Sequence, residues 1–441
     1  MTRSVGRQQL GLAMAVALVM GNMIGSGVFL LPASLAAFGG LSLVGWVLSA
    51  AGATCLAMVF ARLAHLVPAA GGPYAYTRMA FGDVPAFLVA WGYWISTWST
   101  LAALAVAGVG YLDPFIPTIV RTPALAALLA ISLVWLFVVV NISSVRRAGH
   151  VQMVTTVIKV LPLALVGIGG LFYFNPDAFV VTAQGPRAVA AGVTEVATLT
   201  LWAFLGLECA TIPAGNISHP ERTIPRATVI GTLLAAAIYI ISTVGVMSLV
   251  PTEVLSTSTA PFADAARVLF GDTVAALIAL GAAISCFGAL NGWTLIVGQI
   301  PLAAARDGVF PKLFTRVSGA ETPVTGIVIA GVLATMLIAS NYTRGLVDLF
   351  TFIILLSTLS TLLAYAFSSL AAFRVGGATL SSSMRLVAGL AFVYSLWAIS
   401  GAGAETVYWG FLLLMAGLPV YVWVSRQTRP EPAALNPEPL Q

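Results

Sequence analysis

Charged residues are scarce in this chain: they make up 8% of its 441 residues, whereas hydrophobic residues make up 59%. A soluble globular protein carries roughly 25% charged residues. The shortage of charge excludes an ordinary soluble enzyme, a disordered chain and a nucleic-acid-binding protein. It favours a protein whose surface faces lipid, so we expect a lipid bilayer as a partner and no nucleic acid.

Cysteine and histidine are also scarce, with three of each. Cys55, Cys209 and Cys286 all lie within apolar runs, and their spacing predicts neither a metal site nor a disulfide. The histidines lie at the ends of apolar runs and form no HExxH-type motif. No nucleophile–base set and no P-loop motif is present. We therefore expect no metal and no other cofactor, and neither enzymatic catalysis nor ATP hydrolysis by this chain.

Long apolar runs, by contrast, are abundant. A membrane-spanning helix needs about 20 predominantly apolar residues, and the chain has twelve such runs. The first is too long for a signal peptide, and eleven others follow it. The predicted fold class is an all-α integral membrane protein with twelve transmembrane helices. Their ranges are Leu10–Ala36, Gly40–Ala64, Val84–Leu112, Thr122–Asn141, Val151–Phe174, Gly192–Gly215, Pro225–Val250, Thr273–Ala305, Pro323–Ser340, Gly345–Phe373, Arg385–Ala402 and Thr406–Ser425.

Lysine and arginine are distributed unevenly between the two sides of these spans. Of the 20 Lys and Arg residues, 15 fall on one side, four on the other, and Lys159 lies inside a span. Lys and Arg accumulate on the cytoplasmic side of membrane proteins. We therefore expect both termini, residues 1–9 and 426–441, to be cytoplasmic. The longest outer connection, Pro251–Asp272, is expected to contain a short helix at the membrane interface.

Glycine interrupts two of the predicted spans. GNMIGSG (Gly21–Gly27) breaks the first span, and FLGLECA (Phe204–Ala210) places Gly206 beside Glu208 in the sixth. Each glycine in a helix interior costs roughly 1 kcal/mol relative to alanine. Paired interruptions of this kind are typical of secondary transporters, in which half-helix ends bind the charged groups of the substrate. The pattern predicts a site for a zwitterionic amino acid, and close helix packing through small residues is the alternative.

Four large or charged side chains lie deep inside the spans. Burying an ionisable residue such as Glu208 or Lys159 costs at least about 2.5 kcal/mol on insertion scales, so a functional role or a structural ion pair between the two is expected. Trp202 and Trp293 lie in the middle of spans, away from the interface where tryptophan is usually enriched. Their faces suit a cationic group, although core packing explains each tryptophan equally well.

Several long motifs resemble those of a known family. The chain contains GNMIGSGVFLLPASLAAFGG, GGPYAYTRMAFG, LTLWAFLGLECATIPAGNISHPERTIPRAT and NGWTLIVGQIPLAAARDGVFP. These are similar to the amino acid–polyamine–organocation (APC) superfamily, and most of all to bacterial basic amino acid/polyamine antiporters of the arginine/agmatine type. The resemblance implies an inverted five-plus-five repeat with broken helices 1 and 6. The first repeat would be 10–174 and the second 192–373, followed by helices 11 and 12 in 385–425, often in a homodimer.

The resemblance also implies residues that bind the main chain of the substrate. Ser26 and the N–H of Gly27 would hold its carboxylate. The carbonyl groups of Met23, Trp202 and Leu205 would hold its ammonium group. Ser26 and Trp202 would also form the gate nearest to the substrate.

Other residues are assigned in the same way. Trp293 would stack on the cationic side chain of the substrate, with Ser357 and the backbone of Ser96 and Thr97 nearby, and Asn22 belongs to the unwound stretch of the first span. An inner gate coupled to pH would consist of three further side chains, Tyr93, Glu208 and Tyr365.

Two positions depart from the antiporter pattern. Leu101 stands where antiporters have an asparagine that receives the guanidinium group, and Lys159 stands where they have an apolar residue. A lysine there resembles neutral amino acid permeases, in which it replaces a sodium ion. The predicted function is a bacterial inner-membrane arginine/agmatine-type antiporter that works by alternating access and contributes to acid resistance. The alternatives are a proton-coupled or exchanging permease for neutral amino acids that uses Lys159, and a transporter-like sensor.

Overall fold

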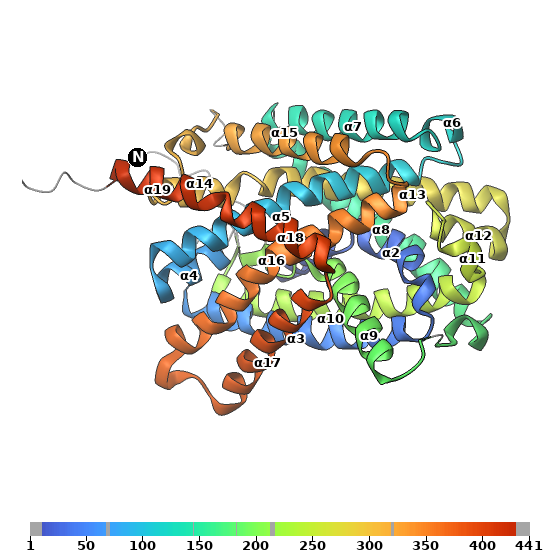
Figure 1. The fold of residues 1–441 in the computed structure, drawn as a ribbon, viewed down its shortest axis with the longest axis horizontal. Helices are drawn as coiled ribbons and strands as arrows, with labels where there is room; N and C mark the ends of the chain where they lie inside the picture. The colour runs from blue at the N-terminus through green and yellow to red at the C-terminus, as the bar shows by residue number, and fades with distance from the viewer. Residues whose placement is uncertain are drawn as a thin grey trace, which may run out of the picture.

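The computed structural model describes residues 11–67, 71–143, 145–181, 183–211, 217–318 and 322–428, and the regular secondary structure in these ranges is entirely helical (Figure 1). The first half contains α1 (Leu12–Met23), α2 (Ser26–Leu35), η1 (Ala36–Phe38), α3 (Leu41–Leu66), α4 (Pro73–Phe81), α5 (Asp83–Gly110), α6 (Pro117–Val120), α7 (Pro123–Ser143), α8 (Val145–Leu171) and η2 (Pro176–Phe179). The second half begins with α9 (Pro186–Leu201), η3 (Trp202–Phe204), η4 (Cys209–Thr211), α10 (Pro220–Leu249), α11 (Thr252–Leu255), α12 (Pro261–Phe270) and α13 (Asp272–Ile296). It ends with α14 (Gln299–Arg306), η6 (Lys312–Thr315), α15 (Val324–Asn341), α16 (Leu346–Gly376), η7 (Gly377–Thr379), α17 (Ser382–Ser400), α18 (Ala404–Met415) and α19 (Gly417–Thr428).

Ten helical segments within the described ranges are long and apolar enough to cross a membrane, which confirms the all-helical membrane class. The two other predicted spans are helical as well. Val84–Leu112 corresponds to α5, and Val151–Phe174 falls mainly in α8, whose described apolar part is Ile158–Leu171. The middle of α5 contains the polar stretch WISTWST. These side chains are surrounded by protein and not by lipid-facing surface, because the helix is buried from Gly92 to Gly110. The count of twelve spans and the inverted repeat stay predictions.

Both predicted interruptions are present. Helix α1 ends at Met23 and α2 begins at Ser26, so two non-helical residues divide the first span. In the sixth span α9 ends at Leu201, and the chain reaches Gly206 with φ +107°, a conformation that favours glycine. The two interruptions touch, because a Cβ atom at Gly206 would lie 3.2 Å from the Cβ atom of Asn22.

The interrupted segments lie at the centre of the bundle. Helices α1 and α2 pack between α5, α8, α10, α13 and α16, whereas α17 and α18 lie at the periphery (Figure 1). Peripheral helices expose large apolar side chains, among them Leu386, Val393 and Phe411. Unwound backbone is tolerated at membrane depth only where protein or a cavity surrounds it, and this position meets that condition.

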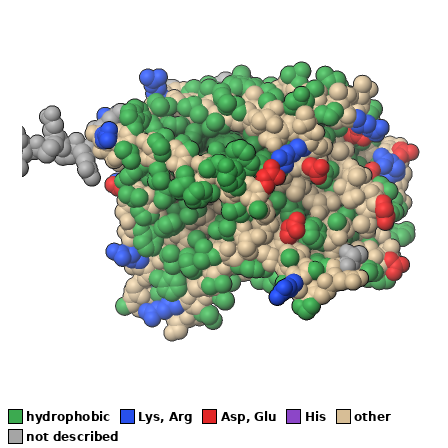
Figure 2. Space-filling model, in the orientation of Figure 1, with side chains coloured by type: hydrophobic (Ala, Val, Ile, Leu, Met, Phe, Trp, Pro, Cys, Tyr) green, Lys and Arg blue, Asp and Glu red, His purple; other side chains and the backbone are tan. Residues whose placement is uncertain are grey.

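Charged side chains gather at the two ends of the bundle. On the face in Figure 2 most of the acidic side chains lie in the half that contains α11 and α12, and apolar side chains cover much of the other half. At the opposite end Arg78 pairs with Asp83 and Asp307, each at 2.9 Å, and Tyr74 donates a hydrogen bond to Asp307. Burial and this hydrogen bond raise the pKa of the Tyr74 phenol far above its usual range.

The predicted helix in Pro251–Asp272 is α12, preceded by the short α11. Its apolar residues Phe262, Ala265 and Ala266 are fully buried, and the helix packs against α13 and α8. This side of α12 is therefore covered by protein, whereas Val268 and Phe270 are exposed.

Candidate functional site

A small cavity lies where the two interruptions meet. Two of the lining residues, Thr100 and Leu104, come from α5. One more, Gly25, belongs to the break in the first span. The other lining residues are all among the predicted substrate-binding residues: Asn22, Met23, Ser26, Gly27, Trp202, Leu205 and Trp293.

One end of the cavity is suited to an anion. Helix α2 starts at Ser26 without a side-chain cap, so the free N–H groups and the positive end of the helix dipole point toward the break. The Ser26 hydroxyl is buried, with 1% of the residue exposed, and it has no hydrogen-bond partner among the described residues. Because an unsatisfied buried hydroxyl costs about 1–3 kcal/mol, a ligand that accepts or donates a hydrogen bond there is favoured.

The carbonyl end of α1 provides the opposite polarity. The Asn22 carbonyl accepts a hydrogen bond from Nε1 of Trp293 at 3.4 Å, and the Gly21 carbonyl accepts one from Nζ of Lys159 at 2.9 Å. Lys159 is fully buried. Exposed carbonyls at the negative end of a helix dipole attract ammonium groups, and Lys159 already occupies one of these positions. Within the described ranges no ion pair joins Lys159 to Glu208.

Two tryptophan rings form walls of the cavity. Trp202 and Trp293 are 5% and 4% exposed, so both are largely withdrawn from solvent and lipid. Trp202 approaches the first span closely: a Cβ atom at Gly27 would lie 2.9 Å from Cδ1 of its ring and 3.2 Å from the Cα atom of Ala203. Glycine at position 27 therefore permits the contact between the two interrupted segments.

The predicted residues Ser96, Thr97 and Ser357 do not line the cavity. The Ser96 hydroxyl is hydrogen-bonded to the Ser357 hydroxyl at 2.8 Å, and the latter lies 3.1 Å from the hydroxyl of Thr100, which does line it. Thr97 donates to a carbonyl of its own helix. Thr100 and Leu104 were not predicted, although their spacing from Ser96 (i+4 and i+8) places all three on one helix face.

The three residues predicted to form the inner gate lie together around one carboxylate. Glu208 accepts hydrogen bonds from Tyr93 at 2.6 Å, from Tyr365 at 2.8 Å and from the backbone N–H of Gly206 at 3.3 Å. Glu208 and both tyrosines are buried, with at most 1% exposed. The carboxylate thus ties the sixth span to α5 and α16. A proton on Glu208 would compete with these donors, so this cluster can link a protonation change to movement of three elements.

Comparison with known proteins identifies the family. Residues 10–377 match the family described as amino acid permease. The chain belongs to this family. The match confirms the resemblance to the APC superfamily, and it agrees with the apolar helices of the fold.

This permease also has relatives that align over nearly their whole length. It is 33% identical over 426 residues to the cadaverine/lysine antiporter of Escherichia coli (strain K12), which covers 94% of both chains. It is 32% identical over 431 residues to the putrescine transporter PotE of Haemophilus influenzae, covering 96% of this chain and 98% of the relative. It is 33% identical over 465 residues to the putative arginine/ornithine antiporter of Bacillus subtilis, with the same two coverages.

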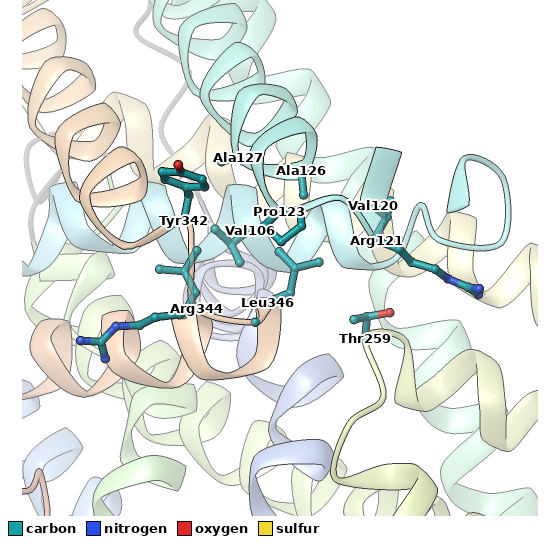
Figure 3. A pocket seen from close by; sticks show the side chains of 12 residues that line it. Val106, Val120, Arg121, Pro123, Ala126, Ala127, Thr259, Tyr342, Arg344 and Leu346 are labelled. Atoms are coloured by element: carbon teal, nitrogen blue, oxygen red, sulfur yellow. The ribbon is translucent and has the colours of Figure 1, made fainter. Parts of the chain in front are cut away.

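The permease contains a second, larger pocket farther along α5. Val106 of α5, Pro123 of α7 and Leu346 of α16 line its apolar middle, and the side chains of Arg121 and Arg344 extend away from it in opposite directions (Figure 3). A binding site for a polar substrate needs convergent polar groups. The cavity between the interruptions has them, so it is the stronger candidate despite its smaller size.

Proposed function

We propose that this permease is an antiporter of the bacterial inner membrane that exchanges a basic amino acid for a polyamine by alternating access. The observation that carries the proposal is the polarity of the cavity, with the start of α2 and the Ser26 hydroxyl on one side and the carbonyl end of α1 on the other. This arrangement matches the carboxylate and ammonium groups of an amino acid. Trp202 and Trp293 add faces on which a cationic side chain can stack.

The substrate pair is a finer proposal. The resemblance of the motifs favours arginine and agmatine, whereas the names of the relatives add lysine with cadaverine, putrescine, and arginine with ornithine. An amino acid with one positive charge and its amine product with two would move one net charge per cycle. That movement is worth about 2.3 kcal/mol per 100 mV. Export of positive charge in acid is the property that an acid-resistance role requires.

Counterflow in proteoliposomes tests this proposal. Vesicles loaded with agmatine should take up labelled arginine, and unloaded vesicles should not, because exchange needs a substrate on both sides. Parallel loads of cadaverine and putrescine, with lysine and ornithine outside, identify the preferred pair. Unlabelled alanine and methionine should compete poorly. Exchange of alanine or methionine without any exchange of basic amino acids would contradict the proposal, and a folded protein without exchange of any kind would favour a sensor.

A neutral amino acid permease is the second candidate, and the placement of Lys159 favours it. Its ammonium group lies 2.9 Å from the Gly21 carbonyl, one residue before the cavity-lining Asn22. A fixed cation there would repel a cationic substrate by an amount that depends on distance and local dielectric. It could also carry the coupling proton in place of a metal ion.

Lys159→Met separates the two candidates. Methionine keeps most of the side-chain volume and removes the charged hydrogen bond to Gly21, which is worth about 1.5–3 kcal/mol. If the lysine is structural, arginine exchange should persist and keep its pH dependence while the melting temperature falls. Lys312→Met, at the protein surface, is the control and should change neither arginine exchange nor the melting temperature. If Lys159→Met loses the pH dependence of transport, and the transported substrates are neutral amino acids, the result supports the neutral amino acid permease.

A further inference from the structure

A groove opens on the outside of the bundle, between one end of α3, the start of α10 and the start of α17. Its rim contains Arg62 and His65 from the last two turns of α3, and Arg222 and Arg226 from the first two turns of α10. Each pair has helical spacing, i and i+3 or i and i+4, so both members of a pair face the groove together. This end of the bundle is the one predicted to be cytoplasmic.

The groove continues from the basic rim onto an apolar surface. Met58 on α3 and Ile230 on α10 line it and are 39% and 41% exposed. Both lie one turn farther into the spans than Arg62 and Arg226. The groove thus has a basic end and an apolar surface that runs along two membrane-spanning helices. A phospholipid fits this arrangement, with its phosphate at the rim and one acyl chain along the apolar surface.

The positive charge at the rim is not neutralised within the described part of the protein. The ion pairs found there use Arg78, Arg121, Arg267 and Arg344. Arg62 instead donates to the carbonyl and hydroxyl of Thr379, at 3.3 and 3.4 Å.

One carboxylate, Glu221, also lines the groove. Its backbone carbonyl is hydrogen-bonded to the imidazole of His65 at 3.1 Å. Three guanidinium groups therefore face a single carboxylate, and the rim keeps a net positive charge.

We propose that this groove binds an anionic phospholipid of the cytoplasmic leaflet, with its phosphate between Arg62, Arg222 and Arg226. Basic pockets between membrane helices at the cytoplasmic surface bind anionic head groups in this way. The bound lipid bridges α3 and α10. The proposal depends on the membrane location of the permease and not on the identity of its substrate.

Native mass spectrometry of the delipidated full-length protein tests the proposal. Titration with phosphatidylglycerol should add one lipid at low concentration, whereas phosphatidylcholine should not. Each arginine near an anionic surface contributes about a factor of five to binding, so Arg222→Gln with Arg226→Gln should weaken phosphatidylglycerol binding roughly thirty-fold. Inorganic phosphate should not displace the lipid, because it lacks the acyl chain. Equal binding of both lipids to the native protein, or displacement by phosphate, would overturn the proposal.

Two further variants test whether lipid binding depends on the groove itself or on positive surface charge in general. Lys312→Gln with Arg316→Gln removes the same charge from η6 and its C-terminal neighbour, outside the groove, and should leave phosphatidylglycerol affinity unchanged. Ile230→Trp narrows the acyl channel without changing any charge and should lower the affinity about as much as the double arginine variant. The proposal fails if the control variant loses the lipid equally, or if Ile230→Trp binds it normally. If the double variant does not fold, the single variant Arg222→Gln gives the same test, with about a five-fold loss of phosphatidylglycerol affinity.

Discussion

Replacing Glu208 by alanine should lower the stability of the purified permease by about 3 kcal/mol or more, because three buried donors lose their acceptor and each costs about 1–3 kcal/mol. These donors are the hydroxyls of Tyr93 and Tyr365 and the N–H of Gly206. The loss should appear as a melting temperature several degrees lower in detergent. Transport should fall as well, because α5 and α16 are no longer tied to the sixth span.

Glu405→Ala is the matched control for this variant. Glu405 pairs with Arg344 at the surface at 2.6 Å, and its side chain is 56% exposed. An exposed ion pair contributes about 0–1 kcal/mol, so the melting temperature should hardly change. Equal destabilisation by the two alanine variants would contradict the role of the buried cluster.

The isosteric variant Glu208→Gln addresses protonation rather than stability. Glutamine keeps one acceptor oxygen and cannot gain or lose a proton near neutral pH. If Glu208 is the pH sensor of the inner gate, exchange by Glu208→Gln should lose the pH dependence that exchange by the native protein shows. A native pH profile in this variant would assign pH sensing to another group.

Gly27→Ala should weaken substrate binding roughly 5- to 150-fold and leave the fold intact. The new Cβ atom would lie 2.9 Å from Cδ1 and 3.1 Å from Nε1 of Trp202, and the backbone of Ala203 prevents an easy shift. Overpacking of this kind costs about 1–3 kcal/mol, which corresponds to roughly 5- to 150-fold in substrate affinity. Isothermal titration with arginine, lysine and the corresponding amines measures the effect.

The same substitution at Gly389 is the control for Gly27→Ala. Gly389 lies inside α17, and a Cβ atom there meets nothing within 4 Å. Gly389→Ala should stabilise the helix by up to about 1 kcal/mol and leave exchange unchanged. Normal substrate binding by Gly27→Ala would show that the two interrupted segments can separate without loss of the site.

The sequence predicted the interruptions well because they depend on local composition. Three glycines within Gly21–Gly27 weaken the helix there, although only Gly25 lies in the break itself, and Gly206 is needed where φ is positive. The resemblance to known transporters supplied the residues that cluster in the cavity and around Glu208. The predicted orientation of the termini needs only the order of the spans and the positions of Lys and Arg, and it stays a prediction.

What the sequence did not predict depends on three-dimensional packing. The partner of Lys159 is a backbone carbonyl 138 residues away, which no side-chain pattern can reveal. Ser96 and Ser357 turn toward each other and leave Thr100 and Leu104 at the cavity wall, which depends on the rotation of α5 against α16. The polar middle of α5 weakens its hydropathy signal, although this helix is one of the most buried.

The contact between Gly206 and Asn22 limits how this permease can be tuned. Asn22 lines the cavity, and the N–H of Gly206 is hydrogen-bonded to the carboxylate of Glu208, so the proposed substrate site and the proposed gate are in van der Waals contact. If the gate opens by separating these two residues, substrate that is held more tightly across them must also be released more slowly. Affinity and turnover number therefore trade against each other, and selection for faster exchange is expected to weaken binding.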